Sequence, residues 1–327
     1  MKAWRVNELG DPRDVLKLED VDEPTPGPGQ LRVKVLAAPA NFPDVLLCQG
    51  KYQIKPPLPF TPGVELCGEV LEVGPDVSTF AVGDRVVGNP ELPGGAFAEQ
   101  AIMALANTFP APKALDDAEA SALSIGYQTA WFALHRRTQL LEGEYLLVHA
   151  AAGGVGSAAV QLGKAAGAKV IGVVGGSEKA KYCRELGADL VVDRNSEDFV
   201  SVVKDFTGGH GADVVFDPVG GDAYAGSTKC IAFEGRIVVI GFAGGTVPQP
   251  ALNHALIKNY SIIGLHWGLY KVHNQQVIDN CHVELTRLAD AGLVKPLVSE
   301  RLALSDVADG IGRLGDGSTV GRLVFHA

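Results

Sequence analysis

The sequence predicts an α/β protein in which a mostly β amino-terminal part, expected to form a partly open barrel, precedes a doubly wound parallel sheet. Three observations support this prediction. Residues 1 to about 118 contain strand-like runs cut by turn-forming stretches. Beyond Asp116, short apolar runs alternate with helical patterns, which is typical of a parallel sheet covered by helices on both faces. A Gly-rich turn joins the first of these later strands to its helix.

The first part contains five expected strands of uneven spacing, which favours a partly open barrel. They are Lys2–Val6, Leu31–Ala38, Val64–Val73, Asp84–Gly88 and Ala96–Ile102, and Pro- and Gly-rich turns at residues 24–29 and 56–59 interrupt them. The composition then becomes Ala-rich and predicts helices at Glu119–Leu123 and Tyr127–Leu140.

The later part alternates between the two kinds of element. Strands are expected at Leu146–Val148, Val170–Val174, Leu190–Val192, Asp213–Phe216, Arg236–Ile240 and Ser261–Leu265. Helices are expected at Val155–Ala166, Glu178–Leu186, Phe199–Asp205 and Ala223–Ile231. The chain then continues with a helix near Val277–Ala289, a strand near Leu297–Leu302, a short helix after Ser305 and a closing strand Gly321–Phe325. We therefore expect three segments: a first domain over 1–118, a nucleotide-binding domain over 119–265, and a return to the first domain over 266–327.

Composition narrows the class of protein. The chain has 327 residues, which leaves room for about two domains, and 46% of them are hydrophobic. Its net charge of −10 and the absence of any Lys/Arg run argue against nucleic-acid binding. No apolar segment approaches the roughly 18 residues that span a bilayer, so no membrane role is expected. The five cysteines are scattered and the first residues resemble a charged strand rather than a secretory signal, so we expect a cytoplasmic protein with reduced thiols.

The Gly-rich turn at 150–156 predicts a dinucleotide site. It lies between an apolar strand and an amphipathic helix, where free backbone N–H groups and the helix dipole attract pyrophosphate. The expected contacts are Ala152, Gly153, Gly154, Val155 and Gly156. Ala151 replaces the first glycine of the G-x-G-x-x-G pattern, so the turn must be open enough to accommodate a Cβ. The alternative is a turn that only packs the helix against the sheet.

Several stretches in a fixed order extend this reading to the whole chain. They are Gly27–Val35, Asn41–Asp44, Gly50–Tyr52, Pro62–Val70, Val82–Val86, Ala150–Gly156, Glu185–Asp189, Gly211–Gly220 and Gly321–Val324. With them the chain resembles the medium-chain dehydrogenase/reductase superfamily, and within it the zinc-free quinone oxidoreductase (zeta-crystallin-like) family. The resemblance implies a GroES-like catalytic domain, a Rossmann domain in the middle, and a cofactor in the cleft between them.

The ligands of zinc-dependent relatives are missing. The resemblance places their catalytic Cys at or near Asn41 and their ligand His at Val64, within Gly63-Val64-Glu65, and residues 80–115 contain no Cys for a structural zinc cluster. We therefore expect no metal. Without a Lewis acid to stabilise an alkoxide, alcohol oxidation is disfavoured, and quinones or carbonyl-conjugated double bonds remain as substrates.

The end of the second nucleotide-binding strand predicts NADPH rather than NADH. An NAD site usually places Asp or Glu there to bind the ribose 2′-hydroxyl, whereas this chain has Val174-Gly175-Gly176-Ser177. The resemblance implies that relatives also have a Lys at the position of Lys179. It places Arg194 where relatives often have a Tyr, and an Arg side chain can bind phosphate through two hydrogen bonds. Ser177, Lys179 and Arg194 are thus expected around the 2′-phosphate. The alternative is that the two cations are solvated surface charges.

The resemblance also implies the residues at the reacting end. Asn41 and Tyr52 are expected at the nicotinamide as catalytic residues, with further cofactor contacts from Gly241, Phe242, Ala243 and Arg322. Substrate contacts are expected from Tyr52, Tyr127, Trp267 and Tyr270. The alternatives are a turn-stabilising role for Asn41, an edge position for Tyr52 and plain packing for the other aromatic residues. Glu65 is expected to be structural, because an unpaired buried carboxylate is costly.

Three functions follow as hypotheses. The first is an NADPH-dependent quinone oxidoreductase that transfers hydride without zinc. The second is an alkenal, enone or enoyl-thioester reductase, in which Tyr52 donates a proton or stabilises the enolate. The third is an NADPH-binding protein with little turnover, since the fold alone does not specify activity. The apolar edge at Ser261–Leu265 suggests a homodimer.

Overall fold

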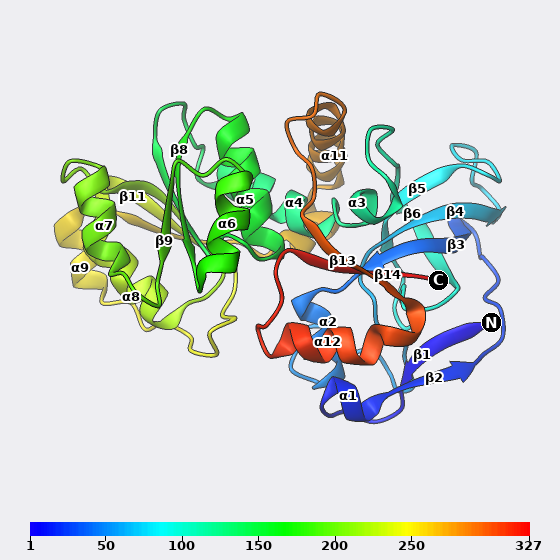
Figure 1. Cartoon of the computed structure of the whole chain (residues 1–327). Coiled ribbons are helices and arrows are strands. Elements are labelled where there is room, and N and C mark those ends of the chain that lie inside the picture. The colour runs from blue at the N-terminus through cyan, green and yellow to red at the C-terminus, as the bar shows by residue number, and fades with distance from the viewer. The chain divides into compact units, whose positions relative to one another are not determined.

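The computed structural model describes all residues 1–327, and the chain divides into two compact units. The first comprises Met1–Ile125 and Lys295–Ala327, and the second comprises Gly126–Val294 (Figure 1). The carboxyl-terminal return therefore begins at residue 295, later than the residue 266 expected from the sequence. Local contacts explain the difference, because Tyr270 packs on Phe132 at a ring distance of 4.3 Å and Trp267 donates a hydrogen bond to Gln128.

A small barrel forms the centre of the first unit. Its six-stranded sheet has the order β13 (Val298–Ala303), β14 (Arg322–His326), β3 (Gln30–Pro39), β4 (Leu66–Val73), β5 (Arg85–Pro90) and β6 (Gln100–Pro110). An additional antiparallel pairing of β3 with β6 joins the two sides of the four-stranded part, while β13 and β14 extend the sheet outward. The expected partly open barrel is confirmed.

Some details of the first unit differ from the sequence pattern. The strand expected at residues 96–102 begins at Gln100 and continues to Pro110, because β6 pairs with both β3 and β5. A strand that the pattern missed, β2 (Leu16–Asp20), pairs antiparallel with β1 (Lys2–Val6). The helices of this unit are short: α1 (Pro12–Val15), α2 (Phe42–Cys48), α3 (Asp117–Ser121) and α12 (Val307–Gly315).

Chain ends far apart in sequence meet in the barrel core. Strand β14 pairs antiparallel with β3, so Val324 lies opposite Pro39. The rings of Phe97 and Phe325 contact edge to face at 5.4 Å inside a cluster of buried aliphatic side chains. Aromatic pairs of this geometry add to the free energy gained from burial alone. The carboxyl-terminal strand is thus part of the core of the first unit, as expected.

The second unit is a doubly wound parallel sheet. Its strand order is β12 (Ser261–Gly264), β11 (Ile231–Val239), β10 (Ala212–Asp217), β7 (Tyr145–His149), β8 (Lys169–Val174) and β9 (Leu190–Asp193). All neighbouring pairs are parallel. The order reverses between β7 and β10, and such a switch point is where ligands bind in open α/β sheets. The expected fold class is confirmed.

Helices cover both faces of this sheet (Figure 1). The right-handed crossover rule assigns α5 (Gly154–Ala165) and α6 (Ser177–Glu185) to one face. It assigns α7 (Phe199–Phe206), α8 (Gly221–Cys230) and α9 (Leu252–Lys258) to the other. The unit also contains α4 (Ile125–Trp131, whose first residue belongs to the first unit), the π-helical turn Phe132–Arg137, and the 3₁₀ turn Trp267–Leu269 followed by α10 (Tyr270–His273) and α11 (Gln275–Asp290).

No helix is both long and apolar enough to cross a bilayer. All five cysteines are buried and none forms a disulfide.

Candidate functional site

The turn between β7 and α5 has the geometry of a pyrophosphate cradle. Gly153 precedes the helix with extended backbone, and Gly153, Gly154 and Val155 are the partly exposed residues of the turn. A Cβ on Gly156 would lie only 2.1 Å from the Ala150 carbonyl oxygen, so this position requires glycine. The free N–H groups at the start of this 12-residue helix and its dipole fit a dinucleotide pyrophosphate.

Space for the methyl group of Ala151 comes from a glycine on the neighbouring strand. A Cβ placed on Gly172 of β8 would lie 3.0 Å from the Ala151 methyl group and 2.3 Å from Cys183 Sγ. Gly172 therefore makes room for the alanine at the first position of the Gly-rich pattern. Because the two positions are 21 residues apart in the numbering, the turn sequence alone could not show this compensation.

The guanidinium group of Arg194 lies at the turn after β8. A Cβ on Gly175 would lie 3.2 Å from Arg194 Nε and 3.4 Å from Nη2, so the guanidinium group lies against Gly175. Arg194 is exposed, and Lys179 is half-buried on α6. The structure thus places Arg194 beside the stretch 174–177.

An acid also lies near this turn, and the sequence pattern missed it. Asp193 ends β9, and its Oδ1 accepts hydrogen bonds from the backbone N–H groups of Gly176 at 2.8 Å and Asn195 at 3.0 Å. These two bonds lower the pKa of Asp193, with a smaller contribution from Arg194. Asp193 therefore stabilises the turn and holds the segment that carries Arg194.

Two buried polar residues shape the carboxyl edge of the sheet. His149 ends β7, and its Nε2 lies 2.8 Å from Ser227 Oγ. Burial lowers the pKa of His149 to about 4, so the ring is neutral at pH 7. Asp217 ends β10 and accepts hydrogen bonds from Val219 N and Gly220 N, both at 2.9 Å, while burial raises its pKa. His149 thus links the end of β7 to α8, whereas Asp217 stabilises the turn that follows β10.

The remaining expected residues of the second unit lie on loops and in packing contacts. Gly241, Phe242 and Ala243 follow β11; Phe242 is exposed, and Ala243 N donates to Pro218 O at 3.0 Å. Among the expected substrate residues, Trp267 and Tyr270 are half-buried, whereas Tyr127 is only 1% exposed.

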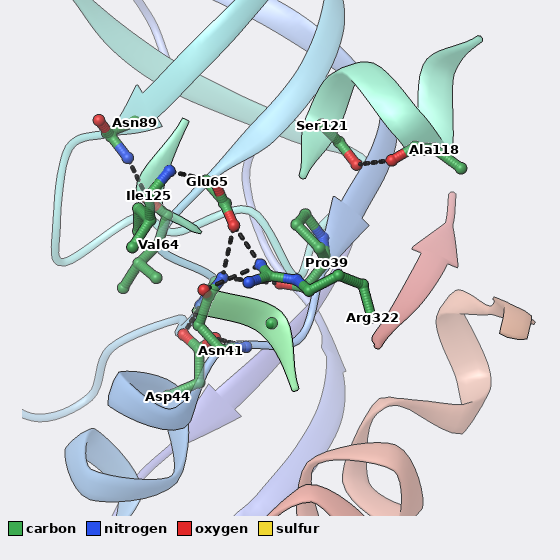
Figure 2. Close-up of polar contacts among 12 residues, drawn as sticks. Pro39, Asn41, Asp44, Val64, Glu65, Asn89, Ala118, Ser121, Ile125 and Arg322 are labelled. Atoms are coloured by element: carbon green, nitrogen blue, oxygen red, sulfur yellow. Dashed lines mark hydrogen bonds and ion pairs between the residues drawn. The ribbon is translucent and has the colours of Figure 1, made fainter. Parts of the chain in front are cut away.

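A buried polar cluster lies at the edge of the barrel in the first unit (Figure 2). It joins Asn41, which follows β3, Glu65, which precedes β4, and Arg322, which begins β14. Arg322 Nη2 donates to Glu65 Oε1 and, at 2.9 Å, to Asn41 Oδ1. Asn41 Nδ2 donates to Glu65 Oε1 at 2.9 Å, and Glu65 Oε2 accepts from Ile125 N at 2.7 Å. Glu65 is fully buried and Arg322 is 5% exposed, so each charge is balanced by the other.

Asp44 supports this cluster from the first turn of α2. Its Oδ2 accepts from Asn41 N and its Oδ1 from Gly63 N, both at 2.9 Å. Burial raises the pKa of Asp44 to about 7. The sequence pattern assigned Asp44 no role of its own, although an acid three residues after an N-cap Asn is a recognisable capping signal.

Tyr52 is half-buried and packs against the barrel core. Burial, and to a lesser extent the charge of Asp44, raises the pKa of Tyr52, so its phenol is protonated at neutral pH. Asn41 and Arg322 thus belong to one hydrogen-bonded cluster. Tyr52 lies near enough to Asp44 for the charge of Asp44 to raise the pKa of Tyr52.

The residues present do not fit a zinc site. No three or more His, Cys, Asp or Glu side chains are grouped so that they could hold a metal ion. Val64 is at the position where the resemblance places a ligand; its side chain packs on the barrel core and its carbonyl oxygen accepts a hydrogen bond from Asn89 at 2.7 Å.

Known proteins resemble the chain over its whole length. Family models match residues 27–113 (alcohol dehydrogenase GroES-like domain) and 154–282 (zinc-binding dehydrogenase). The chain is 38% identical over 330 residues to quinone oxidoreductase-like protein 2 homolog of Nematostella vectensis, covering 99% of this chain and 88% of that protein. It is 32% identical over 329 residues to quinone oxidoreductase of Homo sapiens, covering 99% and 97%.

A solved structure leads to the same family. A mycobacterial protein in complex with NADPH superposes with a TM-score of 0.92 at 30% sequence identity, and the match covers 100% of both chains. The Gly-rich cradle on the doubly wound sheet, the barrel unit and the full-length similarity agree with one another. The chain belongs to the medium-chain dehydrogenase/reductase superfamily, within its quinone oxidoreductase-like family, and is an oxidoreductase that uses a nicotinamide cofactor.

Proposed function

We propose that the protein is an NADPH-dependent quinone oxidoreductase that works without zinc. The position of Arg194 carries the cofactor choice, because its guanidinium lies against Gly175 at the end of β8, while the Asp193 carboxylate of the same turn accepts the backbone N–H groups of Gly176 and Asn195. Two relatives with quinone oxidoreductase in their names support a quinone as the hydride acceptor. The absence of a residue group suited to zinc supports an acceptor that needs no Lewis acid.

The chain's residues have defined tasks in this proposal. Bound NADPH supplies a hydride, which together with one proton converts a quinone into its hydroquinone. The start of α5 holds the pyrophosphate, and Arg194 and Lys179 hold the 2′-phosphate. Gly241, Phe242 and Ala243 serve the nicotinamide half of the cofactor, and the resemblance assigns Asn41 and Arg322 to the cofactor as well. Because a quinone oxygen can take its proton from water, positioning provides most of the rate.

The second candidate is a reductase of alkenals, enones or enoyl thioesters, and Tyr52 favours it. Hydride addition to the β-carbon of such a substrate must be followed by protonation of the α-carbon, and the half-buried phenol of Tyr52 is a group that can supply this proton. Tyr52→Phe should then reduce enone turnover strongly and leave quinone turnover nearly unchanged. Equal loss with both acceptors would argue against a role for Tyr52 as proton donor.

The deciding experiment measures NADPH and NADH oxidation after chelator treatment. The acceptors are 1,4-benzoquinone, 9,10-phenanthrenequinone and a short 2-alkenal, and NADPH binding is titrated separately. Quinone turnover that prefers NADPH supports the proposal. Turnover with the alkenal alone supports the second candidate, and tight NADPH binding without turnover supports a binding protein. Activity that is lost with the chelator and restored by zinc would overturn the metal-free mechanism.

We further propose a homodimer formed through the second unit. Strand β12 is an edge strand with β11 as its single neighbour, and Leu256 and Ile257 of the nearby α9 are 78% and 73% exposed. Exposed apolar side chains next to an open edge favour association. Light scattering should give twice the chain mass of 34.3 kDa, and Leu256→Glu with Ile257→Glu should give the monomer. A wild-type monomer at micromolar concentration would contradict this proposal.

A further inference from the structure

A cavity of about 430 Å³ lies in the first unit, and it includes no residue of the buried polar cluster of Asn41, Glu65 and Arg322. Its walls come from β1, the link between β2 and β3, the loop between β5 and β6, and the first half of β6. All of its lining residues belong to the first unit. A cavity of this volume is in the range that holds small molecules in proteins.

Arg5 lines this cavity and is the one arginine of the first unit that has no ion pair. Each of the others has a carboxylate partner: Arg13, Arg32, Arg85, Arg301, Arg313 and Arg322. Half-buried Arg5 instead donates from Nη1 to Thr61 Oγ1 at 3.2 Å and from Nη2 to Pro59 O at 3.0 Å. Both partners are neutral. They hold the guanidinium in place without balancing its charge, and its other N–H groups remain for an anion.

The other charged groups of the cavity determine how much negative charge a ligand can carry. The carboxylates of Asp22 and Glu91 also line it, and Glu91 Oε2 accepts a hydrogen bond from Gln30 Nε2. The amino group of Met1 donates to Val21 O at 2.8 Å. Because two carboxylates are present, a doubly charged anion such as phosphate is repelled more strongly than a singly charged one. The cavity therefore favours a monoanion.

Much of the remaining lining is apolar and is formed by Val21, Pro24, Leu92, Ala98 and Ile102. Alkyl or aromatic groups that lie against these side chains are removed from water, which favours binding.

The backbone around Thr61 gives the cavity a fixed wall. Thr61 N donates to Pro93 O at 2.8 Å, and Gly95 N donates to Thr61 O at 2.9 Å. A Cβ on Gly95 would lie 2.4 Å from Pro62 O, so the close approach of these two segments requires a glycine. The segment that positions the Arg5 guanidinium is therefore held before any ligand arrives.

We propose that this cavity binds a small monocarboxylate with an apolar body. Its carboxylate pairs with Arg5, since the planar guanidinium matches a carboxylate through two parallel N–H···O bonds. Its hydrocarbon part lies against the apolar lining. This inference is independent of the proposed function, because no residue assigned to the cofactor or to the hydride acceptor lines the cavity.

Isothermal titration calorimetry without dinucleotide tests the assignment. The probes are hexanoate and 4-phenylbutanoate, each compared with its neutral alcohol, 1-hexanol and 4-phenyl-1-butanol. Wild-type protein should bind each carboxylate at least ~10-fold more tightly than the matching alcohol, because hydrogen bonds to charged groups are stronger than neutral ones. Arg5→Gln keeps a donor for Thr61 but removes the charge, so it should abolish this preference.

Two further variants separate binding in the cavity from binding elsewhere. Ile102→Trp fills the cavity from β6, where Ile102 is half-buried, and should weaken carboxylate and alcohol alike by at least ~10-fold. Arg13→Gln removes an arginine from the exposed pair with Asp316 and should leave all affinities unchanged. Circular dichroism and the thermal midpoint report folding. If Arg5→Gln fails to fold, the preference of the wild type for carboxylates together with Ile102→Trp still decides the question.

Three results would overturn the proposal. The first is equal carboxylate affinity in wild type and folded Arg5→Gln, and the second is the absence of binding by either carboxylate up to about 10 mM. The third is inorganic phosphate that binds through Arg5 more tightly than hexanoate, because this result would contradict the choice of a monoanion. A loss of carboxylate affinity in both Arg5→Gln and Ile102→Trp, with Arg13→Gln unchanged, supports the site.

Discussion

Replacing Arg194 with alanine tests the cofactor choice most directly. The guanidinium lies against Gly175, where the sheet turns into α6, and it is exposed. A charge pair at about 4 Å is stabilised by about 1 kcal/mol in bulk water and about 4 kcal/mol at an effective dielectric constant near 20. Hydrogen bonds to charged groups contribute about 1.5–3 kcal/mol. Because Arg194 is exposed, the lower part of this range applies. We therefore expect Arg194→Ala to weaken the free energy of NADPH binding by about 1.5–2 kcal/mol.

That loss corresponds to NADPH binding weakened about 10- to 30-fold. NADH lacks the 2′-phosphate, so its Kd should change less than about 2-fold. Fluorescence titration of both dinucleotides gives the two values, and the NADPH effect should shrink at high salt because exposed charges are screened.

Arg184→Ala serves as the matched control, because it removes the same charge from an exposed position on α6. Its NADPH and NADH affinities should stay at the wild-type level. If Arg194→Ala weakened both dinucleotides equally, or neither, the assignment of Arg194 to the 2′-phosphate would be refuted.

Three further predictions concern the cradle and the buried charges. Gly156→Ala should abolish dinucleotide binding in titration, since its Cβ would lie 2.1 Å from a carbonyl oxygen. Arg322→Ala should lower the free energy of unfolding by about 3–5 kcal/mol in urea because Glu65 is left buried and unpaired, whereas Arg301→Ala, in an exposed pair, should cost under about 1 kcal/mol. The pKa of His149 is lowered from 6.5 to about 4, so its contribution to stability is present above pH 6.5 and lost as the pH falls towards 4. His149→Gln should remove about 2 kcal/mol of that acid sensitivity in denaturant titrations at pH 7 and 4.5, and an unchanged pH dependence would contradict the buried neutral ring.

Local sequence patterns were sufficient to predict most strands and helices of the second unit. The strand, Gly-rich turn, helix and strand over residues 145–174 follow one another without interruption, and each is identified by its own periodicity and turn residues. The pattern was weaker in the first unit, where α2 and β2 escaped detection. Both are short elements whose stability comes from contacts with distant segments, which a window of neighbouring residues does not contain.

The sequence by itself determined the fold class, the cradle at Gly153–Gly156 and the family, because each depends on residue type and spacing along a continuous stretch. Tertiary structure alone decided the rest. It brought Arg194 against Gly175, set Gly172 opposite Ala151, and joined Asn41 to Glu65 and Arg322, which lie 24 and 281 residues away along the chain. Hydrogen-bond geometry depends on distances and angles within fractions of an ångström, and these exist only once the separate strands have packed into one core.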